Sequence, residues 1–226
     1  MALDNHYVMF GYNQLLVDFA EIIHLNGGRL SKIVCNVKEP IIEGRKRLTE
    51  RLPVVARAQA GDAPEVIWLD DFEPQEGENY ILGVPGRKME PLVQQLTDAF
   101  GLEFCKLIHP KAMVSASATI SPGCIINTGA IIASGVQLDE HVFINRGATI
   151  GHDTHIQSHG VVQPNANLAG YIKMGRGAVV GLGAAVIEDR VIGDRSIVAA
   201  GSVVIRDVPP ETMVAGVPAV SKKSLV

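Results

Sequence analysis

Aliphatic residues recur at every sixth position through the second half of this chain. The series runs from Ile108 to Val204 without a change of phase. Its seventeen members are Ile108, Val114, Ile120, Ile126, Ile132, Leu138, Ile144, Ile150, Ile156, Val162, Leu168, Met174, Val180, Val186, Ile192, Val198 and Val204. An α-helix, with a period of about 3.6 residues, and an amphipathic strand, with a period of about 2, do not produce this spacing. A period of six is typical of a parallel β-helix built from hexapeptides.

A second series of smaller residues stands four positions after the members of the first. It comprises Ala112, Ala118, Cys124, Ala130, Val136, Val142, Ala148, Thr154, Gly160, Ala166, Ile172, Ala178, Ala184, Arg190, Ser196 and Ser202. Except for Ile172 and Arg190, none of these residues is larger than valine. We expect three hexads, or 18 residues, to close one triangular coil, with the aliphatic residue inside and the small residue beside it. The repeat then makes a little over five coils.

The first half of the chain alternates between strand and helix patterns. Buried strands are predicted at 7–11, 30–38, 66–70 and 80–84, and helices at about 14–24 and 88–100. Asn13 is the expected cap of the first helix, and Gly101 ends the second. The sequence therefore predicts two domains. Residues 1–107 form a small Rossmann-like α/β domain of βαβ type with a parallel sheet, and residues 108–226 form an all-β parallel β-helix.

Composition supports two cores of different character. Nine of the eleven aromatic residues precede residue 108, and only Phe143 and Tyr171 follow it. A narrow β-helix interior with no room for rings explains this deficit. The net charge of −4 divides into −5 over 1–107 and +1 over 108–226. No basic surface of the kind that binds nucleic acid is indicated, so we expect no nucleic-acid partner.

The chain also lacks the signals of a membrane or secreted protein. No apolar run approaches the ~18 residues of a membrane span. An acidic residue, Asp4, stands where a secretion signal would carry positive charge. The three cysteines have no metal-type spacing, and their odd number argues against a disulfide framework. We therefore expect a cytoplasmic protein.

Four segments in hexad register carry a resemblance to a known family. They are IHPKAMVSASATISPG (108–123), INRGATIGHD (144–153), NLAG (167–170) and AGVPAV (215–220). With the N-terminal βαβ domain, the chain resembles the left-handed β-helix acyltransferases of the sialic acid O-acetyltransferase and nucleotide-amino-sugar N-acetyltransferase family. The resemblance implies a left-handed coil, acetyl-CoA as cosubstrate, no metal, and a nucleotide-linked amino sugar as acceptor for polysaccharide biosynthesis. It also implies a homotrimer with active sites between subunits.

His152 and Asp153 occupy the position of the family's general base and its acidic partner. An amine or hydroxyl loses a proton as it attacks the thioester of acetyl-CoA, and a neutral imidazole can accept that proton. A carboxylate on the other ring nitrogen fixes the tautomer and stabilises the imidazolium. Adjacent residues on a strand point apart, so the pairing requires the geometry of a corner.

The family's CoA-contacting positions fall on Val161, Gly170, Leu182 and Ala200. Val161 departs from the family pattern, which has a histidine there that contacts the thioester oxygen. Two alternatives remain: His159 takes that role from a nearby corner, or backbone N–H groups alone stabilise the oxyanion.

Asn127 and Asn145 are one coil apart, in the sequences INTGA and INRGA. An internal asparagine ladder accounts for both residues. Because Asn145 precedes the GHD segment (151–153) by one hexad, contact between Asn145 and the acceptor sugar is the alternative.

The N-terminal domain departs more strongly from the family. The glycine-rich turn expected after the first strand is here Gly11-Tyr12-Asn13, with a single glycine. Gly11, Tyr12 and Asn13 are the candidate substrate-binding residues, with backbone N–H groups contacting an anion. Tyr12 has two alternative roles: its ring stacks on a base, or it closes the pocket. The segment GVPGRK (83–88) offers Arg87 or Lys88 to a phosphate. The alternative is a domain that only supports the trimer.

Three other functions are alternatives to the leading N-acetyltransferase hypothesis. One is O-acetylation of a sugar hydroxyl. Another is a metal enzyme of the β-helix carbonic-anhydrase type, with His152, His155 and His159, or His141 with His159, as ligands. The third is a non-enzymatic trimeric scaffold.

Overall fold

The computed structural model describes residues 5–225. The chain divides into two compact units. Unit 1 comprises Met1–Val84 and Val93–Leu107, and unit 2 comprises Pro85–Leu92 and Ile108–Val226. The short segment Pro85–Leu92 therefore groups with the repeat and not with the sheet that precedes it.

Unit 1 is built around a four-stranded parallel sheet. Its strands are β1 (His6–Phe10), β2 (Arg29–Cys35), β3 (Glu65–Trp68) and β4 (Asn79–Leu82), in the order β3-β2-β1-β4. The helices of the first 107 residues are α1 (Leu16–Leu25), α2 (Leu48–Ala58) and α3 (Glu90–Phe100), with 3-10 turns at Leu69–Asp71 and Arg87–Met89. The predicted βαβ arrangement is confirmed. Because β2 and β4 flank β1, the strand order reverses at β1, and ligands bind α/β sheets at the carboxyl ends of strands at such a point.

The start of α1 differs from the prediction. The helix begins at Leu16, and the residue before it, Leu15, makes no side-chain cap hydrogen bond. The predicted cap, Asn13, accepts a hydrogen bond from the Leu15 N–H at 2.7 Å. A side-chain oxygen that bonds the backbone two residues on closes an Asx turn. Asn13 therefore shapes the turn before the helix and is not the N-cap.

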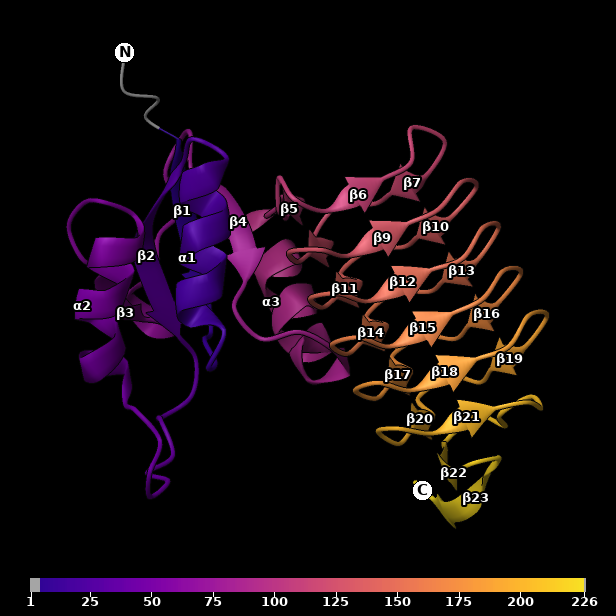
Figure 1. Cartoon of the computed structure of the whole chain (residues 1–226). Helices are drawn as coiled ribbons and strands as arrows, with labels where there is room; N and C mark the ends of the chain where they lie inside the picture. The colour runs from indigo at the N-terminus through magenta and orange to yellow at the C-terminus, as the bar shows by residue number, and fades with distance from the viewer. Residues whose placement is uncertain (1–4, 226) are drawn as a thin grey trace. The chain divides into compact units, whose positions relative to one another are not determined.

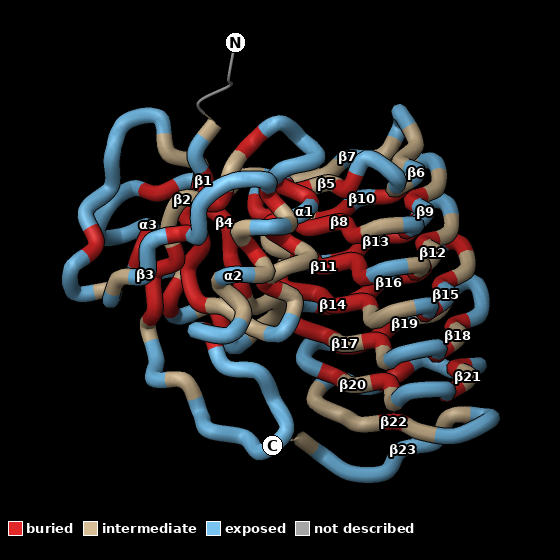
Figure 2. The backbone as a smooth tube through the Cα atoms, turned by 60° about the vertical axis from the view of Figure 1, so that its left-hand side comes forward, coloured by how far each residue is buried: buried red, intermediate tan, exposed pale blue. Residues whose placement is uncertain are grey.

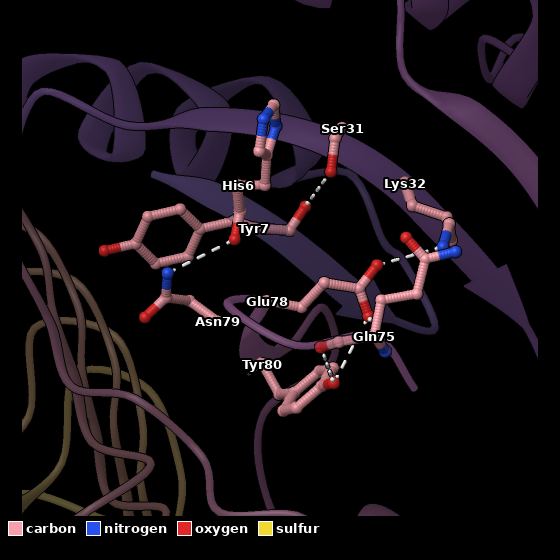
Figure 3. Close-up of polar contacts among 8 residues, drawn as sticks. All are labelled: His6, Tyr7, Ser31, Lys32, Gln75, Glu78, Asn79 and Tyr80. Atoms are coloured by element: carbon pink, nitrogen blue, oxygen red, sulfur yellow. Dashed lines mark hydrogen bonds and ion pairs between the residues drawn. The ribbon is translucent and has the colours of Figure 1, made fainter. Parts of the chain in front are cut away.

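The carboxylate of Glu78 joins β2 to the segment before β4 (Figure 3). It accepts hydrogen bonds from Lys32 Nζ at 3.0 Å, from the Tyr80 hydroxyl at 3.2 Å and from the Gln75 N–H at 3.0 Å. The Lys32 and Glu78 side chains are only 13% and 8% exposed. Burial, reinforced by Glu78, raises the pKa of Tyr80 to about 12. A buried ion pair with its remaining hydrogen bonds satisfied is a structural brace.

Unit 2 contains a regular succession of two-residue strands. Within the described residues these are β5 (Leu107–Ile108), β6 (Met113–Val114), β7 (Thr119–Ile120), β8 (Ile125–Ile126), β9 (Ile131–Ile132), β10 (Gln137–Leu138), β11 (Phe143–Ile144), β12 (Thr149–Ile150), β13 (His155–Ile156), β14 (Val161–Val162), β15 (Asn167–Leu168), β16 (Lys173–Met174), β17 (Val179–Val180), β18 (Ala185–Val186), β19 (Val191–Ile192), β20 (Ile197–Val198) and β21 (Val203–Val204). Each strand ends on a member of the aliphatic series. The predicted hexapeptide repeat is confirmed.

These strands form three parallel sheets, which are the faces of a prism (Figure 1). Face A contains β5, β8, β11, β14, β17, β20 and the hairpin strands β22 (Thr212–Gly216) and β23 (Ala219–Ser224). Face B contains β6, β9, β12, β15, β18 and β21, and face C contains β7, β10, β13, β16 and β19. Paired residues are 18 positions apart, as in Phe143 with Val161. The chain therefore turns three corners per coil, called AB, BC and CA after the faces they join.

The interior of the prism is aliphatic. Its core runs from Cys124 to Val214 and, among the described residues, includes no aromatic side chain. Phe143, on the outer side of face A, is also buried, whereas Tyr171 is 54% exposed. Figure 2 shows short buried stretches alternating with exposed corners along the coils. Among the described residues, no helix is long and apolar enough to cross a membrane.

The narrow interior gives a test on two adjacent residues of β19. Ile192 points inward and is fully buried, whereas its neighbour Val191 points outward and is 44% exposed. We predict that Ile192→Phe lowers the free energy of unfolding by about 1–3 kcal/mol, because a ring overpacks the interior. Val191→Phe should change it by less than about 0.5 kcal/mol. Urea unfolding of both variants measures this, and equal effects would contradict a ring-excluding core.

Candidate active site

The side chains of His152 and Asp153 form a hydrogen-bonded pair at corner BC, between β12 and β13. The His152 Nδ1 and Asp153 Oδ2 atoms are 3.0 Å apart. The side chains are 47% and 50% exposed. Asp153 has a φ of 55°, a left-handed conformation that turns consecutive side chains to the same side of the chain. The corner thus supplies the geometry that pairing of adjacent residues requires.

Hydrogen bonds between coils hold this corner in place. The Asp153 N–H donates to the Ser134 carbonyl at 2.9 Å, and the Tyr171 N–H donates to the His152 carbonyl at 2.9 Å. Fully buried Thr154 donates its hydroxyl to the Ala169 carbonyl at 3.1 Å. Each coil therefore positions the backbone of the next.

Gly170 lies against the imidazole of His152. A Cβ atom at Gly170 would stand 2.6 Å from His152 Cε1, 2.7 Å from Nε2 and 3.1 Å from Nδ1. These similar distances mean that the ring lies flat over this glycine. The resemblance assigns Gly170 to CoA, and the structure also makes it the surface on which His152 rests.

The pairing with Asp153 determines which nitrogen of His152 is available. A carboxylate at Nδ1 favours the tautomer with its proton on that atom. The lone pair is then on Nε2, at a half-exposed position. Such a nitrogen can remove a proton from an incoming nucleophile and return it to a leaving group.

A second histidine–aspartate pair lies on the neighbouring face. His155, on β13 of face C, places its Nε2 3.0 Å from Asp139 Oδ1, with side-chain exposures of 39% and 36%. Here the carboxylate occupies Nε2, so the open nitrogen is Nδ1, closer to the backbone. The two pairs have equal lengths and similar exposure, and they differ in the ring atom that remains free.

His159 lies at corner CA, away from His152. Its ring stacks on that of His141, one coil earlier, with centroids 5.0 Å apart and planes at 12°. Burial, with a contribution from His159, lowers the pKa of His141 to about 4, against an opposing effect of Glu140. Burial also lowers the pKa of His159, opposed mainly by Glu90. Both rings are therefore neutral at neutral pH.

The histidines do not assemble into a metal site. No group of three or more His, Cys, Asp or Glu side chains able to hold a metal ion occurs in residues 5–225. His152 is on corner BC, His155 on face C, and His159 with His141 on corner CA. The separate positions of these histidines give no support to the carbonic-anhydrase alternative.

The other CoA-contacting candidates occupy different places in the prism. Val161 is on β14 of face A, where it is 4% exposed and faces Gly86, at which a Cβ would stand 3.1 Å from Val161 Cγ2. Leu182 and Ala200 share corner AB, one coil apart, and Leu182 is 56% exposed. Within one copy of the chain, at least one face of the prism therefore lies between these residues and His152, which is on corner BC.

Asn127 and Asn145 stack at corner AB as interior residues. They are 2% and 4% exposed. Asn145 donates its Nδ2 to Gln163 Oε1 at 3.3 Å and accepts from the Arg146 N–H at 2.8 Å. The polar ladder therefore continues through Gln163, and its hydrogen bonds account for Asn145 without a ligand.

The turn after β1 in unit 1 is tightly folded. Gly11 has a φ of 66°, and its N–H donates to the Val34 carbonyl at 2.8 Å. A Cβ at Gly83, after β4, would collide with the Gly11 carbonyl, so both glycines allow the close approach of these strand ends. Burial, together with Glu39, raises the pKa of Tyr12 to about 12. Gly11, Tyr12 and Asn13 therefore lie together at the point where the strand order reverses.

Sequence reasoning missed helix α2 and the segment before it, whose side chains meet this turn. Glu39 accepts hydrogen bonds from the Leu48 N–H at 3.0 and 3.2 Å, so its carboxylate occupies the N-terminus of the helix. Arg51 donates to the Gln14 backbone carbonyl at 3.3 Å. With the side-chain amide of Gln14 turned so that its oxygen faces Arg45, that oxygen accepts from Arg45 at 3.0 and 3.2 Å. The run Arg45-Lys46-Arg47 in an acidic domain was the signal that points to this cluster.

Arg87, offered by the sequence as a phosphate ligand, makes a contact within unit 2. Its Nη1 donates to the Arg195 carbonyl at 3.0 Å, and its side chain covers Gly177. Lys88 is exposed. The segment from Pro85 therefore serves first to pack against the coils of corner CA.

Comparison with solved structures gives full-length matches. The acetyltransferase domain of PglB from Neisseria gonorrhoeae is 23% identical, with a TM-score of 0.79 over 97% of this chain and 100% of that one. PerB from Caulobacter crescentus, solved in complex with CoA and GDP-perosamine, is 25% identical, with a TM-score of 0.76 over 96% and 97%. WeeI from Acinetobacter baumannii is 16% identical, with a TM-score of 0.76 over 96% and 99%. No protein-family model matches the chain.

These matches define the class of fold. The chain has the fold of the left-handed β-helix sugar acyltransferases, with a small N-terminal βαβ sheet followed by the coils. The fold class and the resemblance predicted from the sequence are confirmed.

The stacked histidines predict how stability depends on pH. His141 has a folded-state pKa of about 4 against an ordinary value of 6.5. Between these values the unfolded chain binds more protons, so the free energy of unfolding should fall as pH is lowered from about 6.5 to about 4. His141→Asn, which suits the φ of 58° at this position, should flatten that dependence. Urea unfolding across this range measures the slope, and parallel curves for the two proteins would contradict the assignment.

Proposed function

We propose that this chain is an acetyltransferase that moves acetyl from acetyl-CoA to the amino group of a nucleotide-linked sugar. The observation that carries the proposal is the His152–Asp153 pair, whose Nδ1–Oδ2 contact of 3.0 Å leaves Nε2 open at a half-exposed corner of the coil. The matched structures support the substrate class: PerB was solved with CoA and GDP-perosamine, and PglB contributes an acetyltransferase domain.

His152 acts as the general base in this reaction. The acceptor nitrogen attacks the thioester carbonyl carbon, and its proton passes to His152 Nε2 while Asp153 stabilises the imidazolium. The new C–N bond forms as a tetrahedral oxyanion develops. Collapse of that intermediate breaks the C–S bond, and the CoA thiolate takes the proton from His152. The acetyl group moves directly, with no acetyl-enzyme.

Gly170 supplies the group that stabilises the oxyanion. Its Cα lies under the imidazole, and among the described residues its N–H has no hydrogen-bond acceptor. A fixed N–H beside the reacting carbon is a typical oxyanion donor. Backbone donation thus replaces the family's second histidine, whose position is taken here by buried Val161.

The functional unit is a homotrimer with active sites between copies. CoA that contacts Leu182 and Ala200 on corner AB as well as Gly170 on corner BC has to bridge two chains. Three copies in which corner BC of one faces corner AB of the next close a ring with threefold symmetry. The exposed Leu182 side chain is an apolar surface suited to such a contact.

Unit 1 binds the nucleotide at the carboxyl ends of its strands. Gly11, Tyr12 and Asn13 form the turn at that edge, and Arg45 and Arg51 meet it through Gln14. These cations offset the net charge of −5 over residues 1–107, which by itself repels a phosphate. The reaction is assigned to the cytoplasm, in keeping with three cysteines that form no disulfide.

The first test is transfer of acetyl from acetyl-CoA to a panel of nucleotide-linked amino sugars. The panel includes matched sugars with a hydroxyl in place of the amine. Thiol release should require an amino acceptor, and His152→Asn should lower kcat/KM by about 100-fold or more, since general base catalysis contributes about 10²–10⁴-fold. Product mass measures the acetyl group gained.

His155→Asn is the matched control. It removes the other histidine–aspartate pair, of the same 3.0 Å length, and should leave kcat/KM within about threefold. Loss of activity in His155→Asn with retention in His152→Asn would reject the assigned base. Transfer only to hydroxyl acceptors would replace the proposed reaction by O-acetylation.

Gly170→Ala should also reduce acetyl transfer. The added methyl would stand 2.6 Å from His152 Cε1 and must push the imidazole away. A displacement of about 1 Å costs up to about 100-fold in rate, so kcat should fall by about 10- to 100-fold. Glu188→Ala, at the same corner position one coil on, should have wild-type kcat. A normal kcat in Gly170→Ala would show that the imidazole does not rest there during catalysis.

A further inference from the structure

Tyr171 is an aromatic residue that the packing of the β-helix does not explain. After residue 107 the only other aromatic is Phe143, which is 2% exposed. Tyr171 is 54% exposed and lies outside the aliphatic core, on corner BC. A large exposed ring on a corner contributes little to burial of apolar surface, so another role has to account for it.

The backbone at Tyr171 is in a conformation that tyrosine disfavours. Its φ is 58°. The same corner position in neighbouring coils holds Gly135 (φ 70°), Asp153 (φ 55°) and Asp189 (φ 58°). Glycine adopts the left-handed region readily and aspartate tolerates it, whereas it is unfavourable for tyrosine. His141, His159 and Arg195 take the same conformation at corner CA, with φ of 58°, 59° and 54°, so the coil imposes this backbone at its corners, and the contacts of the Tyr171 side chain carry the inference.

The ring of Tyr171 contacts the imidazole of His152. The two ring centroids are 5.0 Å apart and the planes are perpendicular. Edge-to-face ring pairs at this centroid distance are favourable. The imidazole is then bounded by Asp153 at Nδ1, by Gly170 against its flat side and by Tyr171 at a right angle. Tyr171 thus completes the set of contacts that orient the ring.

We infer that Tyr171 is a positioning residue for His152 and that its exposed ring is a wall of the acceptor site. The inference rests on the proposed function. The perpendicular contact keeps the imidazole from rotating, so that Nε2 stays turned outward to the acceptor. The C–H groups of a sugar ring pack on an aromatic face, so the exposed Tyr171 ring beside the imidazole suits a pyranose acceptor. The acceptor site should therefore prefer an amine carried on a sugar ring to a small free amine.

Three variants of corner BC test this inference. Tyr171→Phe keeps the ring and should retain kcat within about twofold. Tyr171→Asn removes the ring and suits the left-handed backbone, so its Tm should equal or exceed that of the wild type. Its kcat should fall by about 10- to 100-fold, and its KM for the nucleotide-linked amino sugar should rise while KM for acetyl-CoA stays constant. Asp189→Asn, at the same corner position without a ring, is the control with unchanged kinetics.

Each outcome has a defined meaning. Wild-type kcat in Tyr171→Asn, or a loss in Tyr171→Phe as large as in Tyr171→Asn, would overturn the positioning role of the ring. A fall in kcat with no change in acceptor KM would overturn the acceptor wall and retain the positioning role. A lowered Tm in Tyr171→Asn would assign Tyr171 to folding and overturn the inference.

A measurement independent of activity separates this inference from the proposed function. The ring current of Tyr171 should displace the NMR signals of the His152 ring protons, and Tyr171→Asn should remove that displacement, whereas Asp189→Asn should not. If the wild type transfers acetyl to no acceptor, the proposed function fails, and this displacement still decides whether Tyr171 holds the imidazole. Identical His152 signals in wild type and Tyr171→Asn would overturn the contact.

Discussion

Each coil of unit 2 returns a corner to the position directly above the previous one, and the rest of the structure depends on that stacking. Backbone hydrogen bonds join residues about one coil apart, as between Asp153 and Ser134 or between Tyr171 and His152. A side chain at a corner therefore meets its sequence neighbours and the residues one coil away. The surroundings of His152 are consequently limited to a short column at corner BC, in which Gly170 and Tyr171 follow it.

Stability and chemistry are divided between the inside and the outside of the prism. Among the described residues, the interior is a column of aliphatic and small side chains. The polar pair His152–Asp153 is half-exposed on a corner, outside this interior. The second pair, His155–Asp139, has a contact of the same 3.0 Å length, so the length alone does not select His152 as the base. What distinguishes His152 is that the open nitrogen is Nε2 and that a glycine and a ring hold the imidazole.

Much of the fold could be predicted because the repeat constrains many residues at once. Seventeen aliphatic positions specify the strands of unit 2, and each strand ends where the period places it. Helix α2 was not predicted, because it contains Pro53 and has only Leu48 and Val55 buried, so its apolar period is weak. The predicted N-cap of α1 was wrong, because the Asn13 side chain accepts its hydrogen bond from Leu15, in the turn before the helix. Local signals of this kind compete with several equivalent hydrogen-bonding arrangements.

The candidate site was predictable in part. The GHD segment in hexad register pointed to His152 and Asp153, and the structure brings the two side chains together. The contacts of His152 with Gly170 and Tyr171 join residues 18 and 19 positions apart in sequence. They depend on side-chain orientation at stacked corners, which periodicity does not specify. The partners of Glu39 and Arg45 in unit 1 could not be predicted either. They depend on the position of α2 beside the turn after β1, which the sequence pattern does not specify.

Acetyl transfer is proposed to take place at corner BC, beside His152 and Gly170. A crystal structure of the protein with CoA tests this location most directly. The account predicts that the CoA sulfur lies beside His152 Nε2 and the Gly170 N–H, with the pantetheine arm along Leu182 and Ala200 of a neighbouring copy. A sulfur bound beside His155 and Asp139, or at the stacked rings of His141 and His159, would contradict it.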